Sequence, residues 1–595
     1  MDGENNKKSP YEQLMWKNIN KTKDKVEQSA FGSSEKFKWP PSCNASAADQ
    51  EQLKTQIKSN CPQEMTSNNT PIKVKMYIGK KFRIYIKPSN KIVCTVLSKL
   101  KGSEYDLKSN SWSFDIEYTD QVCSDLTKNR IIFEKIPAGT LALARRSFKD
   151  DRYSLETGIY DLLMSFQKEA VNFAINRSGR VLLADDMGLG KTIQALAIAN
   201  YYKIEFPLLI IAPSSLCHSW VDSIRQFLNE ESTLIHERSD FGSRISVISY
   251  NISVNFIDTI ILQKYSVIIC DECHYLKSMT SKRTKLILPA LQKSSRLVMI
   301  SGTPATSRPL ELYPIICALD KTLYPNFQVY GNRYCDGKKR GLYYDYKGCS
   351  NAEELSLVIE KAFMIRRTKD TVLNELPLKF RRQIFLKCPG KNRSFSKHAD
   401  FVGDNPDGQI MQEYREAAGI KKDPVIKYLG NVLEKNIKCI VFAHHKEMLD
   451  NLEEFAKSGS YSYIRIDGST ISSKRHVLVE SFQNDDRVRL AILSLTACCT
   501  GLTLTAAKAV IFAELYWNPG TMLQAEDRIH RIGQKDNIDI HYLVAENTID
   551  EIVWPKLLKK LNVLESLGMS KNDLKTIKGT RENEGFQSVL PFKKA

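Results

Sequence analysis

A glycine-rich turn that ends in lysine and threonine is the segment whose residue types point most directly to chemistry. The sequence DDMGLGKT lies between a strand-like run at 180–184 and a helical pattern at 193–202. This order is the context of a phosphate-binding loop, because loop N–H groups and the positive end of the helix converge on phosphate oxygens. The loop predicts nucleotide binding by Asp185, Asp186, Met187, Gly188, Leu189, Gly190, Lys191 and Thr192.

Two side chains of this loop would act on the phosphates directly. Lys191 would reach the β- and γ-phosphates and Thr192 would ligate Mg²⁺, so ATP and Mg²⁺ are the predicted cofactors. Asp185 stands where the general pattern has its first glycine. Taken alone, this incomplete pattern leaves a chance glycine turn before a helix as the alternative.

An acidic pair, Asp271 and Glu272, follows a second apolar run at 266–270. The carboxyl ends of parallel strands are where such sheets bind ligands. Asp271 could hold Mg²⁺, directly or through water, and Glu272 could orient and deprotonate the attacking water. The alternative is an ordinary polar strand end. Cys270 and Cys273 flank the pair, but this CxxC has no partner pair, so we expect no zinc site.

Two further segments carry side chains suited to phosphate chemistry. Arg528 and Arg531 lie three positions apart in a helical pattern, so they share one helix face. Arginines so spaced can neutralise charge in the phosphoryl-transfer transition state, and a solvated basic face is the alternative. The hydroxyls of Ser301 and Thr303 could link the γ-phosphate to neighbouring structure, or form an ordinary turn. Beside a complete site for Mg²⁺ and ATP, we favour the catalytic interpretation of the arginines.

Alternating strand and helix patterns place these segments in two α/β domains. Short apolar runs separated by helical patterns recur from about residue 150, and the same order restarts after about residue 420. Apolar runs between helices are typical of parallel sheets that helices cover on both faces. We therefore predict two parallel-sheet lobes, with the glycine loop and acidic pair on the first and the arginines on the second. The polar segment 571–595 predicts a disordered tail.

The chain before these lobes divides into a polar leader and a β-rich module. Residues 1–70 are rich in Asn, Ser and Lys and predict a disordered leader. Within 71–146, apolar residues alternate with polar ones at 82–87, and strand-like runs follow at 92–97 and 111–118. We therefore expect a small sheet domain in front of the first lobe.

The overall charge favours a phosphate-rich partner. The chain carries 86 Lys and Arg against 68 Asp and Glu, a formal net charge of +18. Such a surplus favours nucleic acid first and an anionic membrane second, with simple solubility as the alternative. The apolar runs are too short to span a membrane, and no signal-peptide core is visible. The 14 scattered cysteines indicate a reducing compartment, the cytosol or the nucleus.

Together these segments resemble the Swi/Snf-like ATPases of helicase superfamily two. DDMGLGKT, IAPSSL, DECH, SGTP, IVFAHHKEML and QAEDRIHRIGQ occur in that family's order and spacing. That family normally has aspartate at the position of Asp185, so the departure from the general glycine pattern disappears. The resemblance implies two tandem RecA-like lobes, at 150–390 and 391–570, with Gln167 reading the adenine.

Further segments resemble the HepA-related subgroup of annealing helicases or fork remodellers. PSSLCHSW, IRIDGST, FAELYWNPG and HYLVAENTIDEIVWP carry this likeness, and residues 71–146 stand where that subgroup has its small β-rich (α+β) HARP module. The resemblance implies an ATP-dependent DNA translocase that reanneals strands and remodels or stabilises stalled replication forks in the nucleus. Cys273 and the segment Cys498-Cys499-Thr500 depart from the family pattern, and the second departure leaves the coupling of DNA to ATP open.

The predicted HARP-like module has the composition of a DNA-binding surface. Residues 72–101 hold nine Lys or Arg and no acid. Aromatic side chains interleave with the basic ones, which suits branched or single-strand junctions, whereas a soluble basic face is the alternative. The resemblance favours sequence-independent contacts to forked or single-strand/duplex DNA, through Lys80, Lys81, Arg83 and Lys87.

Other partners and functions are weighed against this hypothesis. Relatives often bind replication protein A through an N-terminal basic helix, which makes it a candidate partner of residues 11–30, whereas we expect no sliding-clamp contact and a monomer. A nucleosome-remodelling ATPase and a catalytically silent DNA-binding scaffold are the alternatives. No histone-tail reader is apparent, which argues against the first, and the intact ATP motifs argue against the second. The motifs do not exclude a strand-separating helicase.

Overall fold

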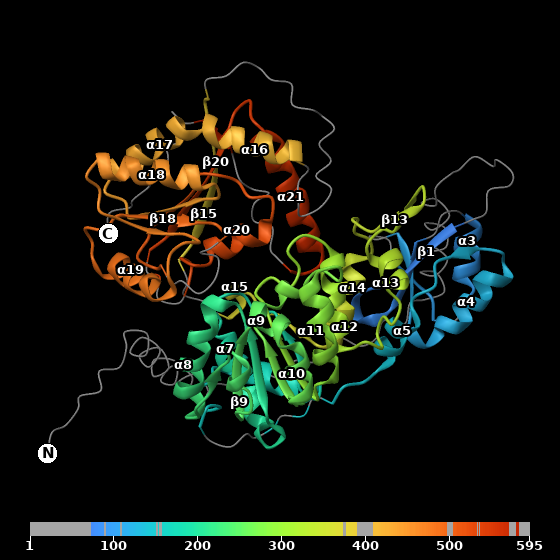
Figure 1. The fold of residues 1–595 in the computed structure, drawn as a ribbon. Coiled ribbons are helices and arrows are strands. Elements are labelled where there is room, and N and C mark those ends of the chain that lie inside the picture. The colour runs from blue at the N-terminus through green and yellow to red at the C-terminus, as the bar shows by residue number, and fades with distance from the viewer. Residues whose placement is uncertain are drawn as a thin grey trace, which may run out of the picture.

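Three folded parts follow one another along the chain in the computed structural model: a β-rich module and two α/β lobes (Figure 1). The structure describes residues 73–87, 91–100, 102–106, 110–149, 151, 153, 158–372, 377–388, 408–496, 504–531, 534, 536–569 and 579–581. The leader predicted at 1–70 lies outside these residues. None of the helices in the described ranges is both long and apolar enough to cross a bilayer.

The β-rich module is a mixed five-stranded sheet with strand order β3-β4-β2-β1-β5. Strands β1 and β5 are parallel, and the other neighbours are antiparallel. Ile84 and Ile86 are fully buried, so alternate residues of β2 face the core, as the sequence predicts. The elements are β1 (Lys73–Ile78), β2 (Ile84–Lys87), α3 (Lys91–Ser98), β3 (Glu104–Asp106), β4 (Ser111–Phe114), α4 (Thr119–Lys128), β5 (Ile132–Phe133) and α5 (Ala138–Arg145).

One predicted strand of this module is a helix. The run at 92–97, which we expected to be a strand, forms most of α3. Val93 and Leu97 are buried, whereas Ile92 is 58% exposed, so the segment buries one helical face. A short, continuous apolar run has no alternation to distinguish a strand from a buried helix. In the fold, Val93 and Leu97 lie four residues apart on one helix face and pack into the core of the module.

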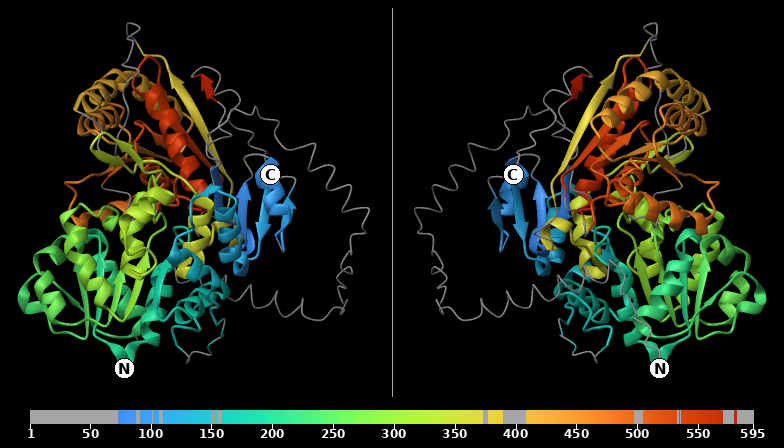
Figure 2. Two further views of the ribbon diagram at one scale, coloured as in Figure 1. Left: turned by 90° about the vertical axis from the view of Figure 1, so that its right-hand side faces the viewer. Right: turned by 90° about the vertical axis from the view of Figure 1, so that its left-hand side faces the viewer.

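Lobe one is a seven-stranded parallel sheet with strand order β14-β6-β11-β10-β7-β9-β8. Its strands are almost entirely buried because helices lie against both faces, as the apolar runs predict (Figures 1 and 2). The elements are α6 (Ser165–Ile175), β6 (Arg180–Leu183), α7 (Lys191–Tyr201), β7 (Leu208–Ala212), α8 (Cys217–Leu228), β8 (Thr233–Leu234), β9 (Ile245–Ser249), α9 (Tyr250–Asn255), α10 (Ile257–Leu262), β10 (Val267–Cys270), α11 (Lys282–Lys293), β11 (Arg296–Ile300), β14 (Met364–Ile365) and α15 (Lys369–Val372).

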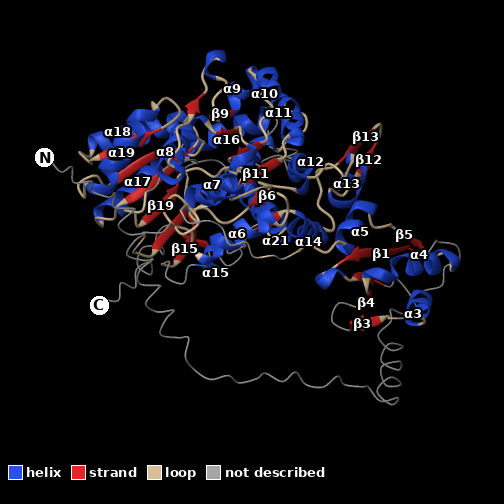
Figure 3. Ribbon diagram, turned by 90° about the horizontal axis from the view of Figure 1, so that it is seen from below, coloured by secondary structure: helices blue, strands red, loops and turns tan. Residues whose placement is uncertain are grey.

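Between β11 and β14, lobe one carries a helical insertion that holds the β-rich module. Its elements are α12 (Tyr313–Leu319), α13 (Phe327–Tyr334), the hairpin β12 (Lys338–Arg340) and β13 (Tyr343–Asp345), and α14 (Ala352–Ala362). Helix α5 of the module lies against α14 (Figures 1 and 3). The module is therefore attached to lobe one at the side away from β8 and β9.

Lobe two is a second parallel seven-stranded sheet, with strand order β17-β18-β16-β19-β20-β15-β21. Its elements are β15 (Lys379–Leu386), α16 (Gly408–Ile420), α17 (Lys422–Glu434), β16 (Cys439–Ala443), α18 (Lys446–Ser458), β17 (Tyr463–Ile466), α19 (Ser472–Asn484), β18 (Leu490–Ser494), β19 (Ala509–Phe512), α20 (Pro519–Glu526), β20 (Ile538–Ala545), α21 (Asp550–Ser566) and β21 (Gly579–Arg581).

Two boundaries differ from the sequence expectation. Strand β15 pairs with β20 over its whole length, so lobe two begins by Lys379 and not after 390. Three residues of the expected disordered tail form β21, which pairs with β15. Both differences arise because strand pairing joins segments that are far apart in the chain, which local periodicity does not report.

Candidate nucleotide site between the lobes

The predicted phosphate-binding loop connects β6 to α7. Gly188 and Gly190 have φ values of +87° and +72°, a left-handed conformation that glycine adopts without strain. A Cβ at Gly190 would lie 2.5 Å from Nε2 of Gln167. The loop therefore requires Gly190 both for its backbone conformation and for space.

Lys191, at the start of α7, donates from Nζ to two carbonyls of its own loop. The acceptors are the carbonyl oxygens of Asp185, at 2.7 Å, and Asp186, at 3.1 Å. Burial lowers the pKa of Lys191, and the Glu272 carboxylate is the strongest of the charges that oppose this effect. Thr192 follows it and is half-buried. The ammonium group lies within the glycine loop, where a phosphate could compete for it.

The two aspartates of the loop bind arginines that sequence reasoning missed. Asp185 is fully buried, and its Oδ2 lies 2.6 Å from Nη2 of Arg367. Oδ1 of Asp186 lies 2.9 Å from Nη2 of Arg366. The signal that could have identified these arginines is their position, two in a row directly after the strand β14. Asp185 and Asp186 thus fix the loop through ion pairs to the two arginines that directly follow β14.

Gln167, the expected adenine reader, is buried between α6 and the loop. Its Oε1 accepts a hydrogen bond from the backbone N–H of Met164 at 2.9 Å. Its Nε2 donates to the carbonyl of Leu189 at 3.1 Å. In this structure the amide therefore joins the start of α6 to the phosphate-binding loop.

The acidic pair follows β10 on the same sheet. Oδ2 of Asp271 accepts a hydrogen bond from the indole Nε1 of Trp220 at 2.9 Å, and Oδ1 accepts one from the backbone N–H of Glu272 at 2.9 Å. Burial, followed by the nearby Glu272 carboxylate, raises the pKa of Asp271 to about 6. Sequence reasoning did not identify Trp220, because a tryptophan in an amphipathic helix reads as a core residue. It orients the Asp271 carboxylate.

Glu272 has a left-handed backbone, with φ of +47°, and its side chain is buried beside His274. Oε2 makes no hydrogen bond of good geometry, although Nδ1 of His274 lies 3.1 Å away. Burial alone would raise the pKa of Glu272, but His274, Lys191 and Arg528 outweigh burial and hold the pKa below its usual value. The side chain is therefore held as a carboxylate with capacity to accept a proton.

The arginines expected from lobe two reach the glycine loop of lobe one. Arg528 is 3% exposed, and its Nη2 lies 3.1 Å from Sδ of Met187. A Cβ at Gly188 would lie 3.5 Å from Cγ of Arg531. Each arginine also donates from Nε to a backbone carbonyl four residues earlier in the chain. The structure thus brings together the loop and both arginines from opposite lobes.

Polar contacts join the lobes beside these arginines. Nζ of Lys369 lies 2.9 Å from Oδ1 of Asp527. Nε2 of Gln524 donates to Oγ1 of Thr303 at 3.0 Å, so the Ser-Gly-Thr-Pro segment meets α20. On the lobe-one side, Oγ of Ser301 lies 3.2 Å from Nδ1 of His274. A chain of contacts therefore runs from the acidic pair to lobe two.

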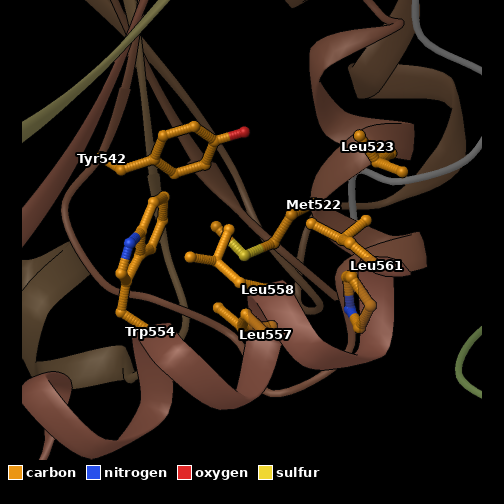
Figure 4. Close-up of a pocket in the computed structure, with 8 residues that line it drawn as sticks. Met522, Leu523, Tyr542, Trp554, Leu557, Leu558 and Leu561 are labelled. Atoms are coloured by element: carbon orange, nitrogen blue, oxygen red, sulfur yellow. The ribbon is translucent and has the colours of Figure 1, made fainter. Parts of the chain in front are cut away.

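Helix α20, which precedes the arginines, packs against α21, and the two helices line an apolar pocket (Figure 4). The lining residues are Pro519, Met522, Leu523, Tyr542, Trp554, Leu557, Leu558 and Leu561. The Tyr542 hydroxyl donates to Glu526, and the other carboxylate oxygen of Glu526 lies 2.7 Å from Nη2 of Arg381. Packing against α21 and this buried ion pair fix the direction in which α20 presents the arginines.

Three observations fit a nucleoside triphosphate with a divalent cation at this site. The glycine loop has the positive φ values and close contacts of a cradle. The Lys191 ammonium lies against this cradle. Asp271 and Thr192 offer the hard oxygen atoms that Mg²⁺ prefers, and nucleotide sites complete its shell with phosphates and water. The residues present therefore suit this cofactor pair.

The four basic residues predicted for DNA contact lie in the β-rich module and have different environments. Lys80, Lys81 and Lys87 are exposed. Arg83 is only 18% exposed, because its guanidinium lies 3.0 Å from Glu104 and 3.0 Å from Asp115. Arg83 therefore holds the module together, and the three lysines remain the candidates for DNA contact. Cys498-Cys499-Thr500 lies outside the described residues.

Comparison with known families matches residues 166–430 to the SNF2-related domain and residues 421–533 to the helicase conserved C-terminal domain. A solved structure, the Sulfolobus solfataricus SWI2/SNF2 ATPase core in complex with dsDNA, aligns with a TM-score of 0.35 and 21% identity. That alignment covers 71% of this chain and 95% of the solved chain. The first match covers lobe one and extends into α17 of lobe two, and the second lies within lobe two and ends before β20.

Three relatives indicate the subgroup. The "SWI/SNF-related matrix-associated actin-dependent regulator of chromatin subfamily A-like protein 1 homolog" of Caenorhabditis elegans is 34% identical, over 88% of this chain and 79% of that protein. The A-like protein 1 of Xenopus laevis is 38% identical, over 80% of this chain and 52% of that protein. The "DNA annealing helicase and endonuclease ZRANB3" of Mus musculus is 40% identical, over 71% and 42%. The chain thus spans about half the length of the frog and mouse relatives. It belongs to the SNF2 superfamily, in the subgroup that contains the A-like protein 1 proteins and the DNA annealing helicases.

Proposed function

We propose that this protein is an ATP-dependent DNA translocase that reanneals complementary strands and remodels or stabilises stalled replication forks. ATP would bind between the lobes, and a bound Mg²⁺ would supply charge neutralisation there. Lys191 would move from its loop carbonyls to the phosphates, and Thr192 and Asp271 would bind the cation. Glu272 would take the proton of the attacking water.

The observation that carries this proposal is the position of the lobe-two arginines against the lobe-one loop. Arg528 contacts Met187, and Arg531 lies next to Gly188. Arginines supplied from across an interface stabilise the charge of a transferring phosphoryl group. Because catalysis then needs both lobes together, each cycle of hydrolysis would close and release them. Two lobes on one DNA backbone could convert that cycle into a step along the duplex.

Charge supports DNA as the substrate along which the motor moves. The formal net charge is +18, and the exposed lysines Lys80, Lys81 and Lys87 lie in the β-rich module. Contacts of this kind bind phosphates without reading sequence, and their affinity falls with salt concentration. The names of the Xenopus and mouse relatives refer to a regulator of chromatin and a DNA annealing helicase. We propose forked or single-strand/duplex DNA as the preferred shape.

The remaining parts of the proposal concern the cellular setting. A DNA motor related to chromatin regulators and annealing helicases would act in the nucleus. We propose a monomer, since both halves of the nucleotide site come from one chain. Replication protein A is a candidate partner through residues 11–30, which lie outside the described residues.

ATPase measurements across a panel of DNA shapes test the proposal. We expect hydrolysis only with DNA, highest with forks and single-strand/duplex junctions, and none for Lys191→Ala. Replacement of Lys80, Lys81 and Lys87 by glutamate should remove the preference for forks but keep hydrolysis with plain duplex. Equal stimulation by plain duplex would contradict the fork preference, and sliding of mononucleosomes with indifference to forks would favour a remodeller. Annealing unchanged by Lys191→Ala would favour a scaffold.

A further inference from the structure

The β12–β13 hairpin presents a cluster of exposed apolar and basic side chains that the nucleotide site does not use. Leu342 is 105% exposed, Tyr343 is 65% exposed and Tyr344 is 44% exposed. In the described part of the chain, no other two consecutive large apolar residues are both exposed. Contiguous exposed apolar side chains are typical of interaction sites, whereas single exposed apolar residues are normal on a folded protein.

The register of the hairpin places a basic side chain opposite each tyrosine. Arg340 pairs with Tyr343, and Lys339 pairs with Tyr344. Between residues 336 and 347 there are four basic and two acidic residues, a net charge of +2. Lys338 and Arg340 lie near the two acids, at 2.6 Å from Asp336 and 3.2 Å from Asp345. Aromatic rings interleaved with cations suit unpaired nucleic acid, because the rings stack on bases and the cations meet phosphates.

The base of the hairpin is rigidly held. Tyr346 lies against Gly331 and Gly337. A Cβ at either glycine would lie 2.7 Å from the Tyr346 ring. The ring of Tyr346 also meets that of Phe327 edge-on, with centroids 4.9 Å apart. Tyr344 stacks on Tyr346, with centroids 5.9 Å apart. The tip is therefore presented on a fixed support, which lowers the entropic cost of ordering it on binding.

The same helix that supports the hairpin also binds the β-rich module. Gly331 of α13 accommodates the hairpin, and two residues later Arg333 donates from Nη2 to the carbonyl of Met76 in β1 at 2.9 Å. Figures 1 and 3 show the hairpin projecting from lobe one on the side where the module is attached. The hairpin and the module are thus both held by α13 of lobe one.

We propose that the β12–β13 hairpin contacts unpaired DNA bases at a single-strand/duplex junction, with Leu342 and Tyr343 placed against the first open base pair. This proposal rests on the proposed function, because it assumes that the chain acts on DNA. The module would bind the neighbouring duplex backbone, and the hairpin would recognise the position where the strands part. The side chains of the nucleotide site are placed for phosphate chemistry, so the hairpin would supply the contact to the bases.

The full-length double variant Leu342→Ser/Tyr343→Ser tests the proposal, with Tyr343→Phe as the variant that keeps the stacking ring. The control is Ile204→Ser/Leu262→Ser, which changes two lobe-one side chains that are 93% and 76% exposed. Junction binding is measured without ATP, from the fluorescence of a 2-aminopurine base at the first unpaired position of a fork. The DNA concentration for half-maximal ATPase is measured with fork and with blunt duplex.

We expect wild type, Tyr343→Phe and the control to quench 2-aminopurine, and the serine double variant to lose this quenching. The fork concentration for half-maximal ATPase should rise about tenfold for each base stack removed, whereas that for blunt duplex should not change. Wild-type quenching in the serine variant, or an equal loss with blunt duplex, would overturn the junction role. A hairpin that binds a protein partner would also overturn the junction role, because the serine variant would then quench 2-aminopurine in the fork as wild type does. If ATPase in wild type did not depend on DNA, the proposed function would fail, while the quenching would still decide the hairpin.

Discussion

At its interface with the β-rich module, lobe one binds backbone groups of strand β1 through a buried ion pair, whereas at its interface with lobe two it meets side chains that nucleotide chemistry needs. Oε2 of Glu354 accepts a hydrogen bond from the backbone N–H of Ile78 at 2.8 Å, and Arg333 donates to the carbonyl of Met76 at 2.9 Å. A Cβ at Gly139 in α5 would lie 2.1 Å from the carbonyl oxygen of Leu323. Toward lobe two, by contrast, Arg528 meets the Met187 sulfur.

The difference indicates which interface is permanent. Arg333 and Glu354 form a buried ion pair of 2.7 Å within lobe one, and separating the module would break the contacts of this pair to the Ile78 N–H and the Met76 carbonyl. At the nucleotide site, Lys191 donates to carbonyls of its own loop and Arg528 contacts the Met187 sulfur across the lobe interface, and phosphate oxygens can replace both acceptors. We infer that the module moves with lobe one while the two lobes open and close on each other.

The largest expected effect comes from the arginines at the exchangeable interface. Arg531→Ala and Arg528→Ala should each lower the DNA-stimulated kcat by roughly 10³-fold or more, because transition-state charge loses its partner. ATP hydrolysis at saturating DNA measures this effect. Arg487→Ala, at a lobe-two side chain that is 87% exposed, is the control and should keep the wild-type kcat. A wild-type rate in the first two variants would remove lobe two from catalysis.

Glu272→Gln should lower kcat by about 10²–10⁴-fold, because the amide cannot take the proton of the attacking water. Nucleotide binding, measured with a fluorescent ATP analogue, should persist, which separates this variant from Lys191→Ala. The control is Glu231→Gln, a lobe-one side chain that is 80% exposed. Loss of binding in Glu272→Gln would show that the residue is structural.

At the permanent interface, Arg333→Met should destabilise the fold by about 3–5 kcal/mol, because Glu354 would remain buried without its partner. Urea unfolding followed by tryptophan fluorescence measures the change, and Trp112 reports on the module itself. Arg225→Ala breaks an exposed ion pair to Glu231 and should cost less than about 1 kcal/mol. A similar small cost in both variants would contradict the distinction between the interfaces.

Gly139→Ala tests the close backbone contact of the same interface with a single methyl group. We expect a loss of about 1–3 kcal/mol, because the methyl group would overlap the Leu323 carbonyl and α5 would have to move. Gly419→Ala in α16 is the matched control, since a Cβ there meets nothing within 4 Å. The control should be neutral or slightly stabilising. Equal stability of both variants would mean that α5 is loosely attached.

Acid should weaken lobe two in a defined pH range. Burial lowers the pKa of His530 to about 4 and that of His541 to about 3, from an ordinary value of 6.5. Between pH 6.5 and these values the unfolded chain binds more protons, so stability falls as pH falls, by about 1.4 kcal/mol for each histidine at pH 5.5. The raised pKa of Asp271 acts in the opposite direction, in lobe one.

Urea unfolding at pH 7.5 and 5.5 measures this effect, as the difference between wild type and His541→Gln. The variant should lose part of the pH dependence. His476→Gln, at a side chain that is 78% exposed, should behave as wild type. Identical pH dependence in all three proteins would show that His541 is not held in its neutral form.

The sequence predicted the parts of the site that are local in the chain. The glycine loop between a strand and a helix, and the acidic pair at a strand end, depend on residues that are neighbours in sequence. Arg367 and Asp185 are 182 residues apart, and Ile78 and Glu354 are 276 apart, so no local pattern announced these contacts. The error at α3 is of the same kind, because an isolated apolar run acquires its period only from the surface on which it packs.

By itself, then, the sequence determined which chemistry is available: an ammonium group beside a glycine turn, two carboxylates, two arginines and an excess of positive charge. The tertiary structure decided which of these groups meet, which are neutralised and which interface is permanent. Arg83 reads as a DNA contact in sequence, yet two carboxylates pair with it in the fold. The physical reason is that charge and backbone freedom belong to a residue, whereas burial and ion pairing depend on distances between segments that only the folded chain brings together.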